Sequence, residues 1–244
     1  MTQWNPDLYL KYQDERTQPS YDLVSRIDIA EPSRIIDIGC GPGNSTRVLR
    51  ERWPHARITG LDSSPQMIAK ARASDPQGDW ILADAAAWAT NERFDIVFSN
   101  ATLQWIPDHD TLIGKLFGLV RPGGALAVQV PANNHSALWE AVLRVSASEP
   151  WRQAMAGCAE LLTYHDAGYY YDRLATPLGL RPGQAPSRVH LWQTIYYHVL
   201  ADHQGLIDWY ASTGLRPYLE RLADDSERQA FQAQVLAACR DQYP

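Results

Sequence analysis

The chain has 244 residues, 45% of them hydrophobic, and a formal net charge of −6 at pH 7. This length and composition allow one sizeable α/β domain with an appended part. The acidic balance and the lack of any basic run argue against a general nucleic-acid binder. No stretch of eighteen apolar residues and no basic-then-apolar leader occur. We therefore expect a soluble, cytoplasmic protein with no membrane partner.

The cysteines and histidines argue against a disulfide framework and against a metal site. Cys40, Cys158 and Cys239 are odd in number and widely spaced, and the seven histidines include no H-x-x-x-H pair. Metal sites and disulfide scaffolds have characteristic paired spacings, which are missing here, so we expect no metal. Cys40 lies inside a glycine-rich turn, where we interpret it as a small packing residue rather than a nucleophile.

The first predicted strand covers residues 34–38 and runs into this glycine-rich turn. A short apolar run bounded by turn residues is typical of a strand covered on both faces. Gly39, Gly41 and Gly43 remove side chains where the backbone must turn sharply and approach a ligand closely. The helix that follows has three candidate capping residues, which are Asn44, Ser45 and Thr46.

The order of these residues separates two classes of nucleotide-binding turn. Dinucleotide enzymes show G-x-G-x-x-G, but here the third glycine comes one residue early and Asn44 stands in the last glycine's place. Asp37 precedes the first glycine by two residues. This D-x-G-x-G-x-G pattern resembles motif I of class I S-adenosylmethionine (SAM) dependent methyltransferases. The resemblance implies that Asp37 faces the ammonium of the SAM tail; a nicotinamide enzyme stays the alternative.

Two further acids follow predicted strands. The second strand, 56–61, leads to Asp62, whose carboxylate can accept hydrogen bonds from both hydroxyls of a ribose. The alternative is that Asp62 only caps the next helix. The third strand, 79–83, leads to Asp84, which together with the Ala85 N–H can read an adenine edge. A dinucleotide enzyme has less need of an acid there, so Asp84 favours SAM, and the alternative is a solvated loop aspartate.

The next elements complete a parallel sheet. The fourth predicted strand, 94–100, ends in Asn100, and residues 101–106 lead into a helix. Residues 119–124 are predicted as a helix end with a Pro-Gly-Gly stop, followed by a fifth strand over 125–130. Strands that alternate with helices indicate a doubly wound, mostly parallel α/β sheet whose ligand lies at the carboxyl ends of the strands.

The chain divides into three predicted segments. Residues 1–30 are expected to be a helical cover segment, 31–135 a SAM-binding α/β core, and 136–244 a mostly helical, aromatic-rich substrate cover. Within the last segment, residues 188–200 alternate loosely and are rich in β-formers, which predicts a sixth strand that completes the sheet. A final amphipathic helix is expected over 225–240.

Three further segments are specific enough to suggest a family, namely Trp4-Asn5-Pro6-Asp7, Leu103-Gln104-Trp105 and Thr213-Gly214-Leu215-Arg216-Pro217. With these segments, nearly the whole sequence resembles the trans-aconitate 2-methyltransferase family of bacterial enzymes. This resemblance implies a Rossmann-like methyltransferase fold and methyl transfer from SAM to a carboxylate of a small tricarboxylic acid. The family continues into a seventh strand beside the sixth, and we expect that final strand to be missing here.

The resemblance also implies the site residues. Cofactor contacts are expected from Asp37, Gly39, Cys40, Gly41, Asn44, Asp62, Ser63, Met67, Asp84, Ala85 and Asn100. Substrate contacts are expected from Tyr9, Tyr12, Arg16, Gln104, Trp105, Tyr196, Tyr197, His198 and Arg216. A carboxylate is already ionised near neutral pH, so no acid or base catalyst is expected. A different small-molecule acceptor and a non-catalytic SAM-binding protein stay open, as does a pairing of Arg216 with Glu220.

Overall fold

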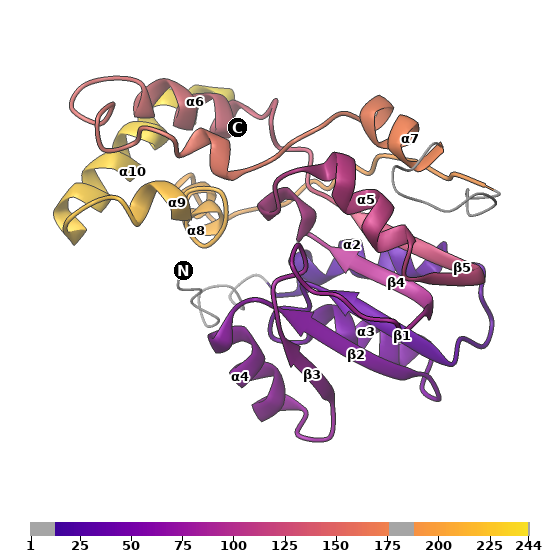
Figure 1. Ribbon diagram of the computed structural model, residues 1–244. Helices are drawn as coiled ribbons and strands as arrows, with labels where there is room; N and C mark the ends of the chain where they lie inside the picture. Colours follow the sequence, from indigo (N-terminus) through magenta and orange to yellow (C-terminus); the bar gives the residue numbers. More distant parts are fainter. Residues whose placement is uncertain (1–12, 176–187, 244) are drawn as a thin grey trace. The chain divides into compact units, whose positions relative to one another are not determined.

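The computed structural model describes residues 13–175 and 188–243, which form two compact units. The sheet unit comprises the described residues of 1–131 and 165–194, and the helical unit those of 132–164 and 195–244. The sheet unit contains α2 (Gln13–Ser25), β1 (Arg34–Ile38), α3 (Asn44–Arg52), β2 (Arg57–Asp62), α4 (Pro65–Ser74), β3 (Asp79–Leu82), β4 (Phe94–Asn100), η1 (Leu103–Trp105), α5 (His109–Phe117), β5 (Val120–Gln129) and α7 (Ala167–Ala175). The helical unit contains α6 (Ala137–Ser146), η2 (Ala159–Leu161), α8 (Gln204–Ala211), α9 (Arg216–Leu219), α10 (Asp225–Cys239) and η3 (Arg240–Gln242) (Figure 1).

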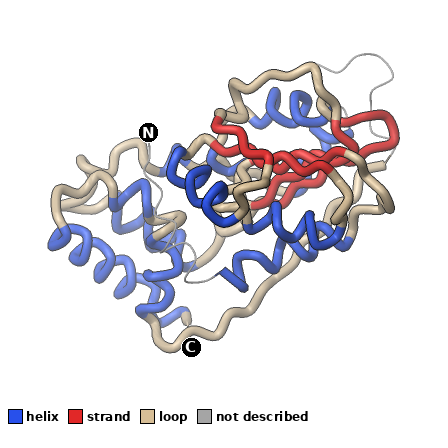
Figure 2. The backbone as a smooth tube through the Cα atoms, turned by 90° about the horizontal axis from the view of Figure 1, so that it is seen from below, coloured by secondary structure: helices blue, strands red, loops and turns tan. Residues whose placement is uncertain are grey.

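The five strands form one parallel sheet in the order β3-β2-β1-β4-β5. Helices lie against both faces of the sheet, as the red strands between blue helices in Figure 2 show. The chain reverses its direction of winding beside β1, since β2 and β3 lie on one side of it and β4 and β5 on the other. This arrangement is the doubly wound, Rossmann-like fold that the sequence predicts, and its switch point lies between β1 and β4.

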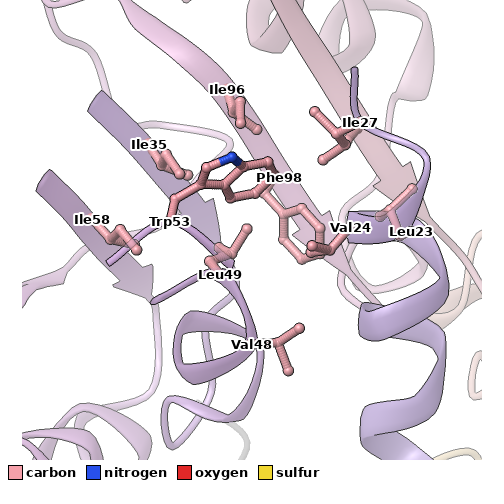
Figure 3. Close-up of a cluster of buried hydrophobic side chains, with 11 residues drawn as sticks. Leu23, Val24, Ile27, Ile35, Val48, Leu49, Trp53, Ile58, Ile96 and Phe98 are labelled. Carbon is pink, nitrogen blue, oxygen red and sulfur yellow. The ribbon is translucent and has the colours of Figure 1, made fainter. Parts of the chain in front are cut away.

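Alternate residues of β1 supply two hydrophobic cores, one on each face. Ile35 belongs to the cluster under α2 and α3, and Ile36 and Ile38 belong to the cluster under α5. Trp53, the C-cap residue directly after α3, lies in the first cluster among Ile35 and its neighbours (Figure 3). Its indole N–H donates to the Ile29 carbonyl at 3.0 Å, so the ring is buried without an unpaired donor. A strand flanked on both faces by apolar cores is fixed in position.

The Pro-Gly-Gly stretch lies within a strand, so its prediction as a helix stop was wrong. α5 already ends at Phe117, where the Gly118 N–H donates to the Gly114 carbonyl. Pro122 and Gly123 lie inside β5, opposite a shift in the register of β4. Proline is tolerated there because β5 is an edge strand among the described residues. Gly123 has a φ of +80°, which is typical of the glycine of a β-bulge.

The predicted sixth strand over 188–200 is also wrong. These residues form no strand in the described chain, where β4 is the partner that β5 pairs with. Ile195, Tyr197 and Val199, which strand formation would place on one face, are 77%, 91% and 99% exposed. The segment spans the boundary between the two units. Residues that favour β structure form a strand only where a neighbouring backbone pairs with them, and no such neighbour is described here.

The helical unit is held together by α6 and α10, which pack against each other. The Trp151 ring contacts Phe231 edge-on at 5.4 Å, and its N–H donates to Gln234 at 2.7 Å. α10 starts and ends within one residue of the predicted final helix. None of the described helices is long and apolar enough to cross a membrane.

Asp95 fastens the strands together at the amino end of the sheet. Its carboxylate accepts hydrogen bonds from the backbone N–H groups of Ser33 and Arg34, both at 2.8 Å, and from the Arg121 guanidinium at 3.0 Å. Burial opposes the ionised form, but these hydrogen bonds outweigh it and lower the pKa of Asp95. One side chain on β4 therefore links the start of β1 to β5.

We predict that Asp95→Asn lowers the free energy of unfolding at pH 7 by about 1–3 kcal/mol, because charge-assisted hydrogen bonds are lost. Since folding depresses this pKa, the contribution is present above the unfolded pKa of about 3.9 and disappears as the pH falls through the folded value. Urea unfolding of both proteins at pH 7 and pH 3 measures it. Equal stability of the two proteins at pH 7 would contradict this role.

Candidate functional site

The predicted cofactor residues of the sheet unit come together at the carboxyl ends of the strands. Gly39 follows β1 directly, Asp62 is the last residue of β2, and Asn100 is the last residue of β4. Asp84 lies two residues beyond β3. Because these strands are parallel neighbours, their ends lie along one edge of the sheet. The structure therefore gathers four segments of the sequence at the switch point, where α/β sheets bind ligands.

Asp37 is a fully buried carboxylate with one oxygen engaged and one open. Its Oδ2 accepts hydrogen bonds from the hydroxyls of Ser45 and Thr46, both at 2.7 Å. Its Oδ1 is buried and has no hydrogen-bond partner among the described residues. Burial raises the pKa of Asp37 to about 6, since desolvation outweighs the two hydrogen bonds. A cationic donor placed at Oδ1 would favour the ionised form.

This pairing corrects the prediction that Asn44, Ser45 or Thr46 caps α3. The N-cap residue is Gly43, in the left-handed region at φ +97°, and no side chain caps it. The hydroxyls of Ser45 and Thr46 turn toward β1 instead, because a buried carboxylate is the stronger acceptor. Sequence reasoning missed both residues as parts of the site. The available signal was a pair of hydroxyl residues directly after a glycine turn that is preceded by a buried acid.

The glycine turn is shaped by contacts from β2 and from the loop after β4. The backbone N–H groups of Gly39 and Cys40 both donate to the Leu61 carbonyl, at 2.7 and 3.0 Å. Gly39 has a φ of +73°, and a Cβ atom there would lie 2.1 Å from Thr102 Oγ1. This hydroxyl donates to the Gly39 carbonyl at 3.2 Å. Only glycine fits at position 39, and Thr102 is a third supporting residue, after Ser45 and Thr46, that the sequence did not reveal.

Cys40 is buried within the turn, 2% exposed. Burial raises the pKa of its thiol, with smaller contributions from the nearby acids Asp37 and Asp62. The thiol therefore stays protonated, which suits packing and opposes nucleophilic attack. In the described chain no group of three or more His, Cys, Asp or Glu side chains is arranged to hold a metal ion.

Asp62 braces the turn from the end of β2. Its Oδ2 accepts from the Gly41 N–H at 2.9 Å, and its Oδ1 accepts from the Ser64 N–H at 2.8 Å. Burial raises the pKa of Asp62. The idea that Asp62 caps α4 is wrong, because Ser64 is the N-cap and accepts from the Met67 N–H. A carboxylate has about four acceptor positions, so Asp62 keeps room for ligand hydroxyls.

The loop after β3 is fixed at both ends. The Ala83 N–H donates to the Asp62 carbonyl at 3.0 Å, and the exposed Asp84 accepts from the Ala86 N–H at 2.8 Å. The ammonium of Lys115 on α5 donates to the carbonyls of Ala85 and Ala86. Ser63 is exposed and Met67 is buried beside this edge. The loop thus holds Asp84 at the carboxyl edge of the sheet, where the Ala86 N–H contacts one of its two carboxylate oxygens.

The loop after β4 carries two more open acceptors. Ala101 has a positive φ of 52°, and its N–H donates to the Gln129 carbonyl at 3.0 Å. The Gln104 amide N–H donates to the Ala101 carbonyl at 2.7 Å. Asn100 Oδ1 and Gln104 Oε1 are buried without a partner among the described residues, and so is the Asn44 amide nitrogen. Together with Asp37 Oδ1, these atoms offer three acceptors and one donor to a polar ligand.

Such unpaired buried atoms point to a ligand rather than to packing alone. Leaving a buried polar group unpaired costs about 1–3 kcal/mol. All four of these atoms belong to segments at the carboxyl edge of the sheet. Three acceptors beside one donor are complementary to a ligand that carries both an ammonium and a carboxylate.

The predicted substrate residues are spread over both units. Tyr9 and Tyr12 lie outside the described residues. Gln104 is buried and Trp105 partly buried in η1, and Arg16 is partly buried in α2. The other four belong to the helical unit and are Tyr196, Tyr197, His198 and Arg216. The structure therefore brings Gln104 to the carboxyl edge of the sheet, while all of the substrate assignments stay predictions.

Arg216 lies in a short helix of the helical unit. It is the first residue of α9 rather than an extended residue before Pro217, because proline is tolerated in the first helical turn. Its side chain is buried, and its Nε lies 3.7 Å from Glu220 Oε1. Burial lowers the pKa of Arg216. Gly214 permits a close contact, since a Cβ there would lie 2.2 Å from the Tyr210 ring.

The chain is similar in sequence to known methyltransferases. Residues 35–124 match the family model of a methyltransferase domain. The chain is 42% identical to the trans-aconitate 2-methyltransferase of Methylobacterium radiotolerans, over 100% of this chain and 92% of that one. It is 40% identical to the Escherichia coli protein of the same name, over 100% and 91%.

The fold is also similar to that of a solved methyltransferase complex. A chain of the complex between a Haloferax volcanii methyltransferase activator and a methyltransferase matches 66% of this chain and 68% of its own length. The TM-score is 0.52 and the sequence identity 21%, a likeness that concerns the fold. The full-length relatives decide the family: this chain belongs to the trans-aconitate 2-methyltransferase family, whose members are class I enzymes that use SAM as methyl donor.

Proposed function

We propose that this chain transfers the methyl group of SAM to a carboxylate oxygen of trans-aconitate, giving the monomethyl ester and S-adenosylhomocysteine. The observation that carries this proposal is the likeness to trans-aconitate 2-methyltransferases, at 40–42% identity along the whole chain. The geometry at the carboxyl edge of the sheet supports the part of the proposal that concerns SAM. The identity of the acceptor acid rests on the family and on the residues of the helical unit.

The residues at the sheet edge fit the SAM molecule. Asp37 Oδ1 is a buried acceptor, suited to the ammonium of the amino-acid tail, and the Asn44 amide is a buried donor, suited to the tail carboxylate. Asp62 has acceptor positions left for the two ribose hydroxyls. Asp84 has an oxygen left for the adenine amino group. Each assignment satisfies a polar atom that the described protein leaves open.

Methyl transfer to a carboxylate requires that the two substrates be positioned correctly, and it requires no acid or base catalyst. When bound, SAM supplies a methyl carbon on a positively charged sulfur. A lone pair of the acceptor carboxylate forms the new O–C bond while the electrons of the C–S bond stay with sulfur. No proton moves, because the carboxylate is ionised near neutral pH. The protein's task is to align the two molecules, exclude water and bind the remaining carboxylates.

The direct test is incubation of the purified chain with methyl-labelled SAM and a panel of di- and tricarboxylic acids. We expect labelled monomethyl ester from trans-aconitate above all others. Turnover of a different acid with none of trans-aconitate would replace the substrate but keep the reaction. Binding of SAM with no transfer to any acid would leave a SAM-binding protein and contradict the proposed function.

We predict that Asp37→Asn stabilises the SAM-free protein but weakens SAM binding. Because folding raises this pKa to about 6, the stability linked to the carboxyl is present below pH 4 and lost as the pH rises through 6. At pH 8 the variant should therefore be more stable by about 1–4 kcal/mol. Calorimetry should show SAM affinity lower by about 1.5–3 kcal/mol, since an amide would face the ammonium.

Asp95→Asn is the matched control, because it is the same substitution at the opposite end of the same sheet. It should destabilise the protein and leave SAM affinity unchanged. If Asp37→Asn binds SAM as tightly as the wild type, Asp37 does not hold the ammonium.

We predict that Asp62→Ala weakens both SAM and S-adenosylhomocysteine by about 1.5–3 kcal/mol, through loss of the ribose hydrogen bonds. The substitution also removes the brace on the Gly41 N–H. Adenosine, which keeps the ribose but lacks the amino-acid tail, is therefore titrated alongside. Weaker binding of adenosine as well would assign the loss to the ribose rather than to the tail. Unchanged affinity of the variant for SAM, by calorimetry, would refute the ribose assignment.

Arg216 is our candidate for binding a carboxylate of the acid. The chain carries a net charge of −6, so a trianionic substrate needs a local cation. Arg216 is a buried cation on a short helix, and burial strengthens its interaction with an anion. An arginine can form two parallel hydrogen bonds that also orient the carboxylate.

We predict that Arg216→Lys raises the KM for trans-aconitate at least about tenfold, because the charge is kept but the paired hydrogen bonds are lost. SAM affinity should stay the same. Arg228→Lys is a matched control in the same unit, where Arg228 donates to the Leu219 and Leu222 carbonyls. That control should lower the Tm only. The contrary result is that Arg216→Lys and Glu220→Gln both lower the Tm and both leave the KM for trans-aconitate normal. Arg216 would then only pair with Glu220.

A further inference from the structure

A buried histidine contacts the loop that follows β4, and both of its ring nitrogens form hydrogen bonds. His109, the first residue of α5, is 1% exposed. Its Nε2 lies 2.8 Å from the Leu103 carbonyl, and its Nδ1 lies 3.0 Å from the Tyr170 hydroxyl. A carbonyl can only accept, so Nε2 carries a proton. Nδ1 then accepts from Tyr170, and the two bonds form a chain from Tyr170 through His109 to Leu103.

The Leu103 carbonyl belongs to the segment that presents polar atoms to the ligand edge. Leu103 begins η1, and the next residue is Gln104, whose Oε1 is buried without a partner among the described residues. The Ile106 N–H also donates to the Leu103 carbonyl at 2.9 Å, which closes the turn. Any shift of the Leu103 peptide therefore moves Gln104 and the turn as a unit.

Tyr170 reaches His109 from a helix distant in the sequence. It lies on α7, which packs against α5 (Figure 1). Tyr170 is 9% exposed, and burial raises its pKa, so the hydroxyl stays protonated as a donor. A second contact joins the same helices at the surface, where Tyr169 and Arg173 donate to Asp110 at 2.7 and 2.6 Å. One α7 contact therefore leads to the ligand loop, and the other does not.

We propose that Tyr170 and His109 are positioning residues for methyl transfer, which hold η1 and Gln104 in place at the ligand edge. The inference rests on the proposed function for the reaction that η1 serves. Simple packing of α7 on α5 would also bury Tyr170, but it would not require a donor hydroxyl aimed at His109. A histidine at this position supplies what packing does not: a rigid ring that donates on one side and accepts on the other.

The experiment compares Tyr170→Phe with Tyr169→Phe. Each removes one hydroxyl from α7 and one hydrogen bond between α7 and α5, so a purely structural role predicts similar, small losses of Tm and no change in kinetics for either. We expect Tyr170→Phe alone to lower kcat by about three- to tenfold, with the KM for SAM unchanged. His109→Gln, which keeps a donor for the Leu103 carbonyl, should retain more activity than His109→Ala.

Amide hydrogen exchange of residues 103–106 gives a readout that needs no turnover. We expect faster exchange in Tyr170→Phe than in the wild type, and wild-type exchange in Tyr169→Phe. A wild-type chain that methylates no acid would refute the proposed function, and the exchange data would still test the hold on η1. Unchanged exchange and unchanged kcat in Tyr170→Phe would overturn the inference, as would equal effects of the two tyrosine variants.

Discussion

The site depends on one buried carboxylate. Asp37 sits in the central strand with no exposed surface, and two hydroxyls from α3 engage one of its oxygens while the other stays open. A buried acid with raised pKa destabilises the folded protein once it ionises. Natural sequences retain such strain mostly at functional sites. A cationic group at the open oxygen would favour the ionised form, and we propose that the ammonium of SAM is that group.

The rest of the sheet unit keeps that carboxylate and its neighbours in register. The glycine turn bonds back to the Leu61 carbonyl, the loop after β3 to the Asp62 carbonyl, and Thr102 to the Gly39 carbonyl. Each loop thus forms hydrogen bonds with a neighbouring strand or turn. Pre-formed loops reduce the ordering cost of ligand binding. The same holds for η1, where His109 donates to the Leu103 carbonyl. On the proposed function, the methyl donor therefore binds to loops that are already ordered.

Most of the sheet unit follows from local sequence. The apolar run before Gly39 and the acid Asp62 at the end of β2 placed the edge correctly, because glycine and strand signals act over a few residues. Three features did not follow, since each depends on a partner remote in the chain. Ser45 and Thr46 bond to β1 instead of capping α3. Pro122 enters an edge strand, and residues 188–200 find no strand to pair with.

The central claim is that Asp37 ionises to receive the ammonium of SAM, and proton release on binding measures this directly. Calorimetric titration with SAM at pH 5.5, in two buffers of different ionisation enthalpy, counts the protons released. With a pKa of about 6 for Asp37 in the SAM-free protein, the account predicts release of roughly half a proton or more per SAM bound at pH 5.5, and almost no net exchange at pH 7, where Asp37 is already ionised and the amino group of SAM is still protonated. Binding that releases no proton at pH 5.5 would contradict the account.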